Sequence, residues 1–380
     1  MRKKICQIIP TLVQGGAEKQ MSLLAMHLDR QQFESHVIVL THSGPLETQL
    51  RDHGVAVHLI GKRGKLDPTA LWRLTRKLRQ LAPDLVHTWL FAANSYGRWA
   101  ARRVGVPVIV AGERCVDPWK SWWHYTIDRY LAQCTSQLVT NTTAVSNFYA
   151  QHGIPAERFQ VIPNAVLPYQ GPRLKRAELF ARLQIPPRAR VVGAVGRLWP
   201  QKNYRDLIWA GELLRVAHQD VCLVIVGDGP EREQLLAFRD HSGCQDAVRL
   251  VGHRTDATEL MSAFDVLWNG SLYEGQSNTI LEAMSMGIPV AASDIPGNRD
   301  LIEPGVSGFL FPPHDLGALT RWTNRLLRED AYRAQVGEQA RQRAAEYFSL
   351  DAMVAVHQQL YERLIARARS RPMPPTLNPK

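Results

Sequence analysis

Short apolar runs alternate with helical patterns along most of the chain. The run Lys4–Pro10 precedes a glycine turn, and the apolar spacing then predicts a helix over about Ala17–Leu28. Such alternation is typical of a parallel sheet with helices on both faces, so it predicts a first doubly wound α/β lobe. The apolar runs that complete this first series are His36–Leu40, Val55–Leu59, Leu85–His87, Val106–Val110 and Gln137–Thr140.

A proline-rich stretch, Pro163–Pro187, interrupts the alternation. Its apolar periodicity is weak, so we interpret it as a linker with a short helix at Arg176–Leu183. A long helix over about Asp351–Arg367 ends the pattern, and the proline-containing tail Ser370–Lys380 is expected to be disordered. Between linker and final helix, a second series of strands is predicted at Arg190–Ala194, Val221–Val226, Val248–Leu250, Val266–Trp268, Pro289–Ala292 and Gly308–Phe311.

These patterns predict two domains. A chain of 380 residues exceeds the ~250–300 residues at which single cores stop growing. We expect a Rossmann-like lobe over 1–170, a linker over 171–188 and a second Rossmann-like lobe over 189–348. A helix over 349–368 and a disordered tail over 369–380 follow. In two doubly wound lobes, a ligand is expected in the cleft between the carboxyl ends of their strands.

The composition is ordinary for a soluble globular protein, with 45% hydrophobic and 21% charged residues. The net charge of +11 favours anionic partners without choosing among nucleic acid, lipid headgroups and phosphorylated ligands. Five cysteines without a CxxC pair indicate reduced thiols in a cytosolic protein. No apolar run reaches the ~18 residues of a membrane helix, and the apolar start lacks a signal-peptide cleavage site. We therefore expect a cytoplasmic protein.

Glycine turns follow the first strand of each predicted lobe. Gly15 and Gly16 let a ligand approach both the backbone and the N-terminus of the next helix. Gly196 and Arg197 follow the first strand of the second lobe, with Lys202 in the same loop. Two cations at this place can hold a diphosphate, Arg through bidentate donors and Lys as a point charge.

Each of these turns also has a plain structural interpretation. The Gly15-Gly16 pair alone is equally a tight turn, and the basic loop of the second lobe can be two solvated side chains. Gly227-Asp228-Gly229-Pro230 directly follows the strand Val221–Val226. It stands where a ligand cleft is expected, but by itself it is equally a strand-to-helix turn.

The segment Glu274–Met284 has the most informative pattern. Ser277 or Asn278 caps the predicted helix, so Glu274 lies in the preceding loop and Glu282 about one turn inside the helix. The N-terminal amides of this helix suit a phosphate, and the two carboxylates suit sugar hydroxyls. The helix is largely apolar and hence buried, so a plain surface helix explains its carboxylate poorly.

Taken together and in this order, the motifs resemble the retaining glycosyltransferases of family four, which have the GT-B fold. The resemblance covers about residues 5–350, and the combination is far more specific than any single motif. It implies an acceptor-side first lobe, a donor-side second lobe and a C-terminal helix that returns to the first lobe. The matching segments are Gly15–Glu18, Pro163-Asn164, Gly196-Arg197 with Lys202-Asn203, Gly227–Pro230, Gly252–Asp256, Glu274 with Glu282, and Gly305 with Gly308.

The resemblance implies a role for each matching residue. Arg197 and Lys202 would bind the donor diphosphate and stabilise it as it leaves. Glu274 would contact hydroxyls of the transferred sugar, and Glu282 would bind the ribose; Glu274, Arg197 and Lys202 are thus the candidate catalytic residues. Further donor contacts would come from Gly15, Gly16, Gly196, Gly227, the backbone at His253 and Arg254, and from Gly275, Gln276, Ser277, Asn278 and Thr279.

One position departs from the family pattern. Family members often have a histidine near the donor sugar, after the fourth or fifth strand of the first lobe. Arg114 stands in that region here and is a candidate for binding a phosphate of donor or acceptor. His87 follows a predicted strand and is either a contact to the sugar or acceptor, or a histidine of the core; both interpretations stay open.

The chemistry requires a nucleoside diphosphate to leave while an acceptor hydroxyl attacks the anomeric carbon. The two cations and the helix N-terminus would stabilise the charge that develops on the leaving phosphates. No Asp-x-Asp, HExxH or CxxC motif occurs in the sequence, so we expect no metal and no cofactor, with a UDP- or GDP-sugar as substrate. The resemblance implies transfer of a hexose-type sugar with retention of configuration.

A basic segment of the first lobe suits a membrane surface. Seven basic residues fall between positions 62 and 79, against the single acid Asp67, and a helix over about Thr69–Leu81 has leucines along one face. Trp119, Trp122, Trp123 and Tyr125 follow, and they suit a membrane interface or a sugar platform, or at least half of them belong to the core. A solvated helix face is the alternative. We expect peripheral contact with the anionic inner face of a bacterial membrane and a lipid-linked or glycan acceptor in surface-polysaccharide synthesis.

Two other classes of function share part of this pattern. A sugar-nucleotide epimerase can share the two-lobed fold, but would convert a nucleotide sugar without an acceptor. A basic nucleic-acid-binding protein is the second, and no recognised nucleic-acid motif occurs, so nucleic acid is not an expected partner.

Overall fold

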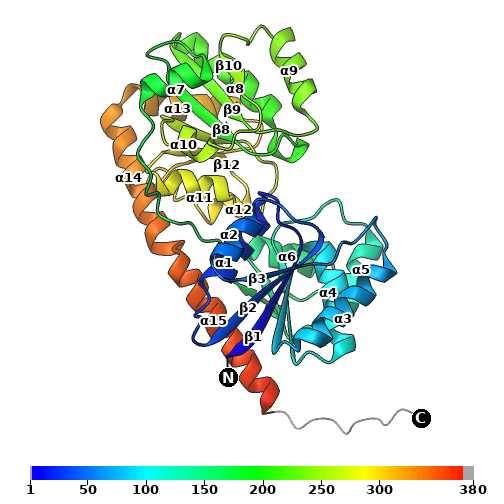
Figure 1. Cartoon of the computed structure of the whole chain (residues 1–380). Helices are drawn as coiled ribbons and strands as arrows, with labels where there is room; N and C mark the ends of the chain where they lie inside the picture. The colour runs from blue at the N-terminus through cyan, green and yellow to red at the C-terminus, as the bar shows by residue number, and fades with distance from the viewer. Residues whose placement is uncertain (1, 371–380) are drawn as a thin grey trace, which may run out of the picture. The chain divides into compact units, whose positions relative to one another are not determined.

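The computed structural model describes residues 2–370, which form two compact units (Figure 1). The first unit comprises the chain up to Asn164 together with the segment from Leu350 on, and the second comprises Ala165–Ser349. Each unit has its own parallel sheet and its own apolar core. The predicted fold class, two Rossmann-like lobes with a C-terminal helix in the first, is confirmed.

The sheet of the first unit has the order β3-β2-β1-β4-β5-β6-β7 with parallel neighbours. Its strands are β1 (Lys3–Thr11), β2 (Phe33–His42), β3 (Ala56–Leu59), β4 (Leu85–Trp89), β5 (Val108–Glu113), β6 (Gln137–Thr140) and β7 (Phe159–Val161). The helices of this unit are α1 (Gly16–His27), α2 (Leu46–Asp52), α3 (Pro68–Leu81), α4 (Leu90–Val104), α5 (Trp122–Ala132), α6 (Thr143–Gln151), the 3-10 turn η1 (Ala156–Arg158) and α15 (Leu350–Arg369).

The sheet of the second unit has the order β10-β9-β8-β11-β12-β13, again with parallel neighbours. Its strands are β8 (Arg190–Val195), β9 (Val221–Val226), β10 (Val248–Leu250), β11 (Val266–Asn269), β12 (Val290–Ser293) and β13 (Phe309–Phe311). The helical segments are α7 (Arg176–Leu183), η2 (Pro200–Lys202), α8 (Tyr204–Ala217), α9 (Arg232–His241), α10 (Ala257–Met261), α11 (Asn278–Ser285), α12 (Pro296–Arg299), α13 (Leu316–Arg328) and α14 (Asp330–Tyr347).

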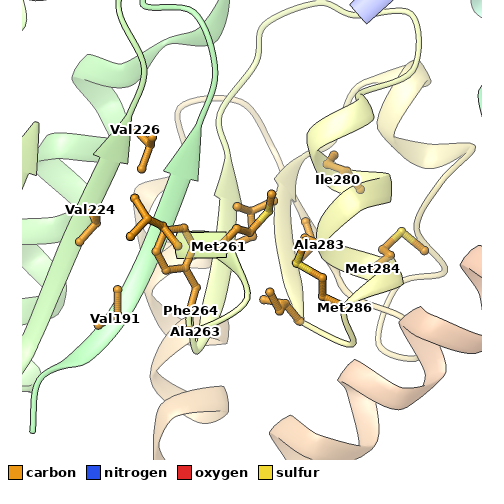
Figure 2. Close-up of a cluster of buried hydrophobic side chains, with 14 of the residues drawn as sticks. Val191, Val224, Val226, Met261, Ala263, Phe264, Ile280, Ala283, Met284 and Met286 are labelled. Carbon is orange, nitrogen blue, oxygen red and sulfur yellow. The ribbon is translucent and has the colours of Figure 1, made fainter. Parts of the chain in front are cut away.

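The core of the second unit holds α11 against the sheet. Figure 2 shows Ile280, Ala283 and Met284 on one side of this helix, within the same apolar cluster as Phe264 and Val224. These side chains are almost fully buried. Burial of apolar surface stabilises the fold by about 25 cal/mol per Å², so this packing holds the helix against the sheet. The N-terminus of α11 is thereby held at the carboxyl edge of the sheet.

Three features differ from the sequence-based expectations. The strand β7 was not predicted, because three residues at a sheet edge have no usable periodicity. The segment 171–188 is no free linker: Leu174, Leu179 and Leu183 are buried in the core of the second unit. The expected boundary at 170 therefore lies at Asn164 in the structure. Of the expected disordered tail, residues 371–380 lie outside the described residues, and Arg369 ends α15.

Candidate functional site

Backbone turns of three neighbouring strands of the second unit meet at one sheet edge. The Gly196 amide donates to the Val226 carbonyl at 3.0 Å, and the Gly227 amide donates to the Gly252 carbonyl at 2.9 Å. Both Gly196 (φ +154°) and Gly227 (φ +150°) have backbone angles that favour glycine. A Cβ atom on Gly227 would lie 1.9 Å from the Gly196 carbonyl oxygen. The turns after β8, β9 and β10 are therefore packed backbone against backbone, which is why position 227 requires glycine.

The basic loop after β8 is anchored from both sides. Leu198 is buried, and its amide donates to the Asp228 carbonyl at 2.9 Å. Arg197 is exposed, with its guanidinium carbon 5.5 Å from the centre of the Trp199 ring. The Lys202 ammonium forms an ion pair with Glu274. Lys202 is thus not a solvated side chain, and the structure brings two of the three candidate catalytic residues into contact.

The loop that presents Glu274 is tied to the same region. The side-chain amide of Gln201 donates to the Tyr273 backbone carbonyl at 2.7 Å, and the backbone amide of Leu272 donates to the Gln201 backbone carbonyl at 2.8 Å. The Ser271 hydroxyl donates to the Glu274 carboxylate at 2.7 Å. Ser271 was not singled out from the sequence, because its contact becomes visible only once β11 and the loop after it are placed.

The N-terminus of α11 lies next to this loop. Ser277 is the N-cap residue, yet in the described structure its hydroxyl does not cap the first-turn amides; it accepts from the Asn269 side chain at 3.3 Å. First-turn amides have no partner inside their own helix, and here they carry the positive end of the helix dipole. Asn278 and Thr279 are half-buried in this turn, and Glu282 is half-buried one turn further.

A tight backbone contact supports the glycine that follows Glu274. A Cβ atom on Gly297, at the start of α12, would lie 1.6 Å from the Gly275 carbonyl oxygen. Gly275 and Gln276 are both buried. Gly297 was missed in the sequence, where the signal was only a proline-glycine pair after the fifth strand of the lobe.

The turn after β10 is closed by its own side chains. Arg254 forms two hydrogen bonds with the Asp256 carboxylate, at 2.8 and 2.7 Å, and this pairing lowers the pKa of Asp256. His253 is exposed. The Arg254 side chain thus stabilises the turn, which leaves the Gly252–Arg254 backbone as the surface for a ligand.

The second unit therefore gathers complementary chemistry at one sheet edge. Two cations and a helix N-terminus favour an anion with the charge of a diphosphate. Two carboxylates on either side of that N-terminus can accept hydrogen bonds from hydroxyl groups.

In the first unit, the predicted glycine turn is present between β1 and α1. Gly15 is the N-cap of α1, and a Cβ atom there would lie 2.2 Å from a carboxylate oxygen of Glu18. The Thr11 hydroxyl donates to that carboxylate at 3.1 Å. The Glu18 side chain thus folds back over the turn at Gly15, and Gly16 opens the helix.

His87 lies in a stack of buried aromatic rings. Its ring is 4.5 Å from that of Trp89, and its Nδ1 is 2.6 Å from the Tyr361 hydroxyl of α15. Its Nε2 has no hydrogen-bond partner within the described part of the chain. Burial lowers the pKa of His87 well below its usual value, so the ring is neutral. This environment is that of a core histidine.

Arg114 is also buried, directly after β5. One guanidinium nitrogen donates to the Asn164 side chain, and the guanidinium carbon lies 5.1 Å from the Trp89 ring centre. Its Nη1 finds no partner among residues 2–370. Burial lowers the pKa of Arg114 to about 9. A buried cation with an unused donor is costly unless an anion completes it, which fits the phosphate contact expected from the sequence.

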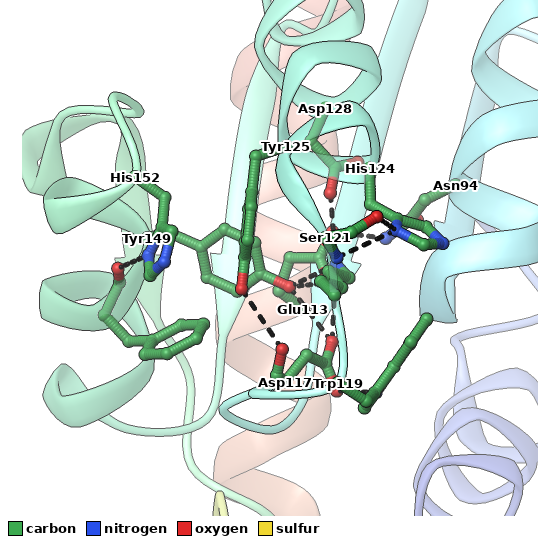
Figure 3. Close-up of polar contacts among 12 residues, drawn as sticks. Asn94, Glu113, Asp117, Trp119, Ser121, His124, Tyr125, Asp128, Tyr149 and His152 are labelled. Atoms are coloured by element: carbon green, nitrogen blue, oxygen red, sulfur yellow. Dashed lines mark hydrogen bonds and ion pairs between the residues drawn. The ribbon is translucent and has the colours of Figure 1, made fainter.

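A network of buried charges holds the segment after Arg114 (Figure 3). The Lys120 ammonium lies 3.0 Å from Asp128, 3.3 Å from Asp117 and 3.6 Å from Glu113. The Tyr149 hydroxyl donates to Glu113 at 2.8 Å. Burial raises the pKa of Glu113, against the opposing effect of Lys120. This network was not predicted from the sequence, because its members are spread over the end of β5, the loop that follows, and the helices α5 and α6.

Across residues 2–370, no group of three or more His, Cys, Asp and Glu side chains is arranged to hold a metal ion. None of the helices in that range combines the length and the apolar character needed to cross a membrane.

Comparison with known proteins identifies the family of the chain. A family model described as Glycosyltransferase Family 4 matches residues 14–168, and one described as Glycosyl transferases group 1 matches residues 189–329. The chain is 30% identical over 321 residues to the UDP-Gal:alpha-D-GlcNAc-diphosphoundecaprenol alpha-1,3-galactosyltransferase of Escherichia coli, covering 79% of this chain and 81% of the relative. It is 30% identical over 316 residues to the GDP-mannose-dependent alpha-mannosyltransferase of Mycobacterium tuberculosis, covering 78% and 80%.

Among solved structures, the fold is similar to that of Anabaena Alr3699/HepE in complex with UDP-glucose. The TM-score is 0.82 at 25% identity, and the match covers 96% of this chain and 99% of the other. A sucrose-phosphate synthase from Thermosynechococcus elongatus has a TM-score of 0.81 at 19% identity, covering 96% and 100%, which shows the fold alone.

Proposed function

The chain belongs to the family 4, group 1 glycosyltransferases, and we propose that it moves a hexose-type sugar from a UDP-sugar to a lipid-linked glycan, with retention and without a metal ion. The observation that carries this proposal is the pairing of Lys202 with Glu274 beside the glycine turns and the α11 N-terminus. UDP is favoured over GDP because UDP complexes are known for the Anabaena neighbour. A lipid diphosphate acceptor is named for the Escherichia coli relative.

In this proposal, the diphosphate lies between the basic loop and the first-turn amides of α11. Lys202 then exchanges part of its contact with Glu274 for a phosphate oxygen, and Arg197 leaves solvent to reach the same group. Glu274, which has then lost part of its contact with Lys202, accepts a hydrogen bond from a hydroxyl of the sugar. Glu282 accepts hydrogen bonds from the ribose hydroxyls. The charge that develops on the leaving diphosphate meets donors that are already in place, which lowers the barrier to departure.

A thermal-shift panel of UDP, GDP, ADP and their sugars tests the donor. A ligand at 100 times its dissociation constant stabilises the protein by ~2.7 kcal/mol, so UDP and one UDP-sugar should raise the melting temperature clearly. ADP should leave the melting temperature unchanged. A shift with GDP alone would contradict the choice of UDP, and a shift with no nucleotide would contradict the donor site.

The two carboxylates should behave differently when replaced. Glu282→Ala should mainly weaken nucleotide binding, because ribose contacts exist before and during the reaction, whereas Glu274→Ala should mainly lower kcat, because it borders the transferred sugar. Calorimetry with UDP and steady-state kinetics separate the two effects. Glu233→Ala serves as control, since that carboxylate is 84% exposed and pairs only with the neighbouring Arg232 among the described side chains. The reverse pattern would show that the roles are exchanged.

Arg114, in the first unit, is proposed to bind a phosphate of the acceptor. Its buried, unused Nη1 supports this assignment. If it is right, Arg114→Gln keeps the thermal shift with UDP and raises KM for a lipid-diphosphate acceptor; a lost UDP shift would place its phosphate on the donor instead.

We further propose that the enzyme works at the cytoplasmic face of the membrane, held there by α3. In the structure, Arg73 donates to the Ile60 and Gly61 carbonyls at 2.8 and 3.0 Å, so it is occupied within the fold. Arg76, Lys77 and Arg79 point away from the buried leucine face and remain available to lipid headgroups.

Flotation with vesicles tests this attachment. Replacing Arg76, Lys77 and Arg79 together with glutamine should weaken binding to anionic vesicles roughly a hundredfold, since each near-surface cation contributes ~1 kcal/mol. Binding should also fall in high salt. The matched control changes three arginines of α13, namely Arg321, Arg325 and Arg328, which are exposed on the second unit. Equal binding of both triple variants would remove α3 from the attachment.

A further inference from the structure

An apolar groove of about 700 Å³ opens on the first unit between α3, α4 and α5. It is lined by Leu66 and Leu71 at and before α3, by Tyr96 and Trp99 of α4, and by Ile127 and Tyr130 of α5. Several of these apolar side chains are exposed to solvent: Leu66 is 89% exposed, Tyr130 52% and Trp99 43%. Exposed apolar surface of this kind marks a binding surface rather than part of the core.

Basic side chains stand against the aromatic rings of this groove. The Lys62 ammonium lies 5.0 Å from the Tyr96 ring centre, and the Arg103 guanidinium lies 5.9 Å from that of Trp99. Arg102 donates to the Tyr130 hydroxyl at 3.2 Å. The groove thus combines an apolar interior with a rim of three cations.

The acid that lines the groove does not cancel this charge pattern. Asp67 accepts from the Thr69 hydroxyl at 2.6 Å and from the backbone amides of Arg63 and Ala70 at 2.8 and 2.9 Å. These hydrogen bonds hold the pKa of Asp67 well below its usual range. Because its carboxylate is already partnered by the N-terminus of α3, the rim remains available to an external anion.

We propose that this groove binds one acyl chain of an anionic phospholipid, whose phosphate is held by Arg102 and Arg103. An elongated apolar site with a cationic rim matches a molecule that is a hydrocarbon at one end and an anion at the other. Other occupants match less well. A soluble glycan has no hydrocarbon chain to fill the groove, and a lipid headgroup that contacted only the cationic rim would leave the apolar interior empty. The same helices and their loops expose Trp72, Trp119 and Trp122, residues that favour the membrane–water interface.

This inference rests on the proposed function only for the place of the enzyme at a membrane. It adds a contact that salt does not screen, because burial of a hydrocarbon chain does not depend on ionic strength. Attachment through α3 alone would vanish in high salt, whereas a filled groove leaves residual binding.

The experiment is flotation with vesicles of phosphatidylglycerol and phosphatidylcholine, in low and high salt. Leu66→Gln and Trp99→Gln should each weaken binding roughly tenfold in high salt, about the effect of exposing one buried apolar side chain. Trp209→Gln is the matched control, because Trp209 is 44% exposed on the second unit and Trp99 is 43% exposed. Bromine-substituted acyl chains should quench tryptophan fluorescence less in Trp99→Phe than in Trp209→Phe.

Each other outcome overturns the groove in a recognisable way. If the groove variants float like the wild type while the α3 triple variant does not, the attachment is electrostatic only. If they float normally but lose turnover with a lipid-linked acceptor, the occupant is the acceptor chain and not a bilayer lipid. The thermal shift with UDP is measured on the same variants, and its loss would indicate a failed donor site or fold rather than a failed groove.

Discussion

Lys202→Ala is expected to lower kcat by roughly 10²–10³-fold, the cost of removing one preorganised donor aimed at developing charge. The Lys202 side chain is only 19% exposed, and its ammonium is paired with Glu274, so the cation is positioned before the substrate arrives. A cation already held at the site needs less reorganisation than a solvated cation, and therefore stabilises the leaving diphosphate more. Arg197→Ala should lower kcat by at least about tenfold, because this exposed side chain must first be ordered.

Steady-state kinetics with a UDP-sugar and an acceptor measures both effects. Arg205→Ala is the matched control, since Arg205 is an exposed cation three positions further along, at the start of α8, and lies over Phe238. Melting temperatures of all three variants show whether folding is intact. Wild-type rates in Lys202→Ala and Arg197→Ala, with folding unchanged, would refute the diphosphate assignment.

Much of the fold follows from local patterns. The strands β9 (Val221–Val226) and β10 (Val248–Leu250) have the bounds that their apolar runs predict. The helix after Glu274 also follows from its apolar spacing, and Ser277 stands at its N-cap position as predicted, although its hydroxyl does not cap the first turn. The segment 171–188 was wrongly predicted to be a linker. Its few leucines have the spacing of one short helix, and only the core of the second unit, formed by distant parts of the chain, shows that this helix is buried.

The site is less predictable where contacts join distant positions. Lys202 and Glu274 are 72 positions apart, and His87 and Tyr361 are 274 positions apart. The sequence motifs single out candidate residues one at a time. Which of them contact one another depends on the order of the strands in the sheet and on where the helices pack. For His87, two interpretations stayed open until α15 supplied Tyr361 and showed the ring to be buried.

Lys120→Met is expected to lower the free energy of unfolding of the first unit by about 3–5 kcal/mol, the usual cost of removing one partner from a buried ion pair. Methionine fills a similar volume but leaves the carboxylates of Glu113 and Asp128 without the ammonium that they share. Arg98 still bonds to Asp128 at 2.7 Å, so Glu113 bears most of the loss. Lys65→Met, at an exposed lysine, should change stability by less than about 0.5 kcal/mol.

The destabilisation by Lys120→Met should shrink as pH falls. Burial raises the pKa of Glu113 in the folded state, and Lys120 opposes this rise, so removing the lysine raises the pKa of Glu113 further. A carboxyl whose folded-state pKa is raised favours folding at low pH and loses that contribution as pH rises through the folded pKa. Denaturant unfolding from pH 5 to pH 8 should therefore show a gap between variant and wild type that widens with pH. A gap of constant size would mean that lost packing, and not the stranded Glu113 charge, causes the effect.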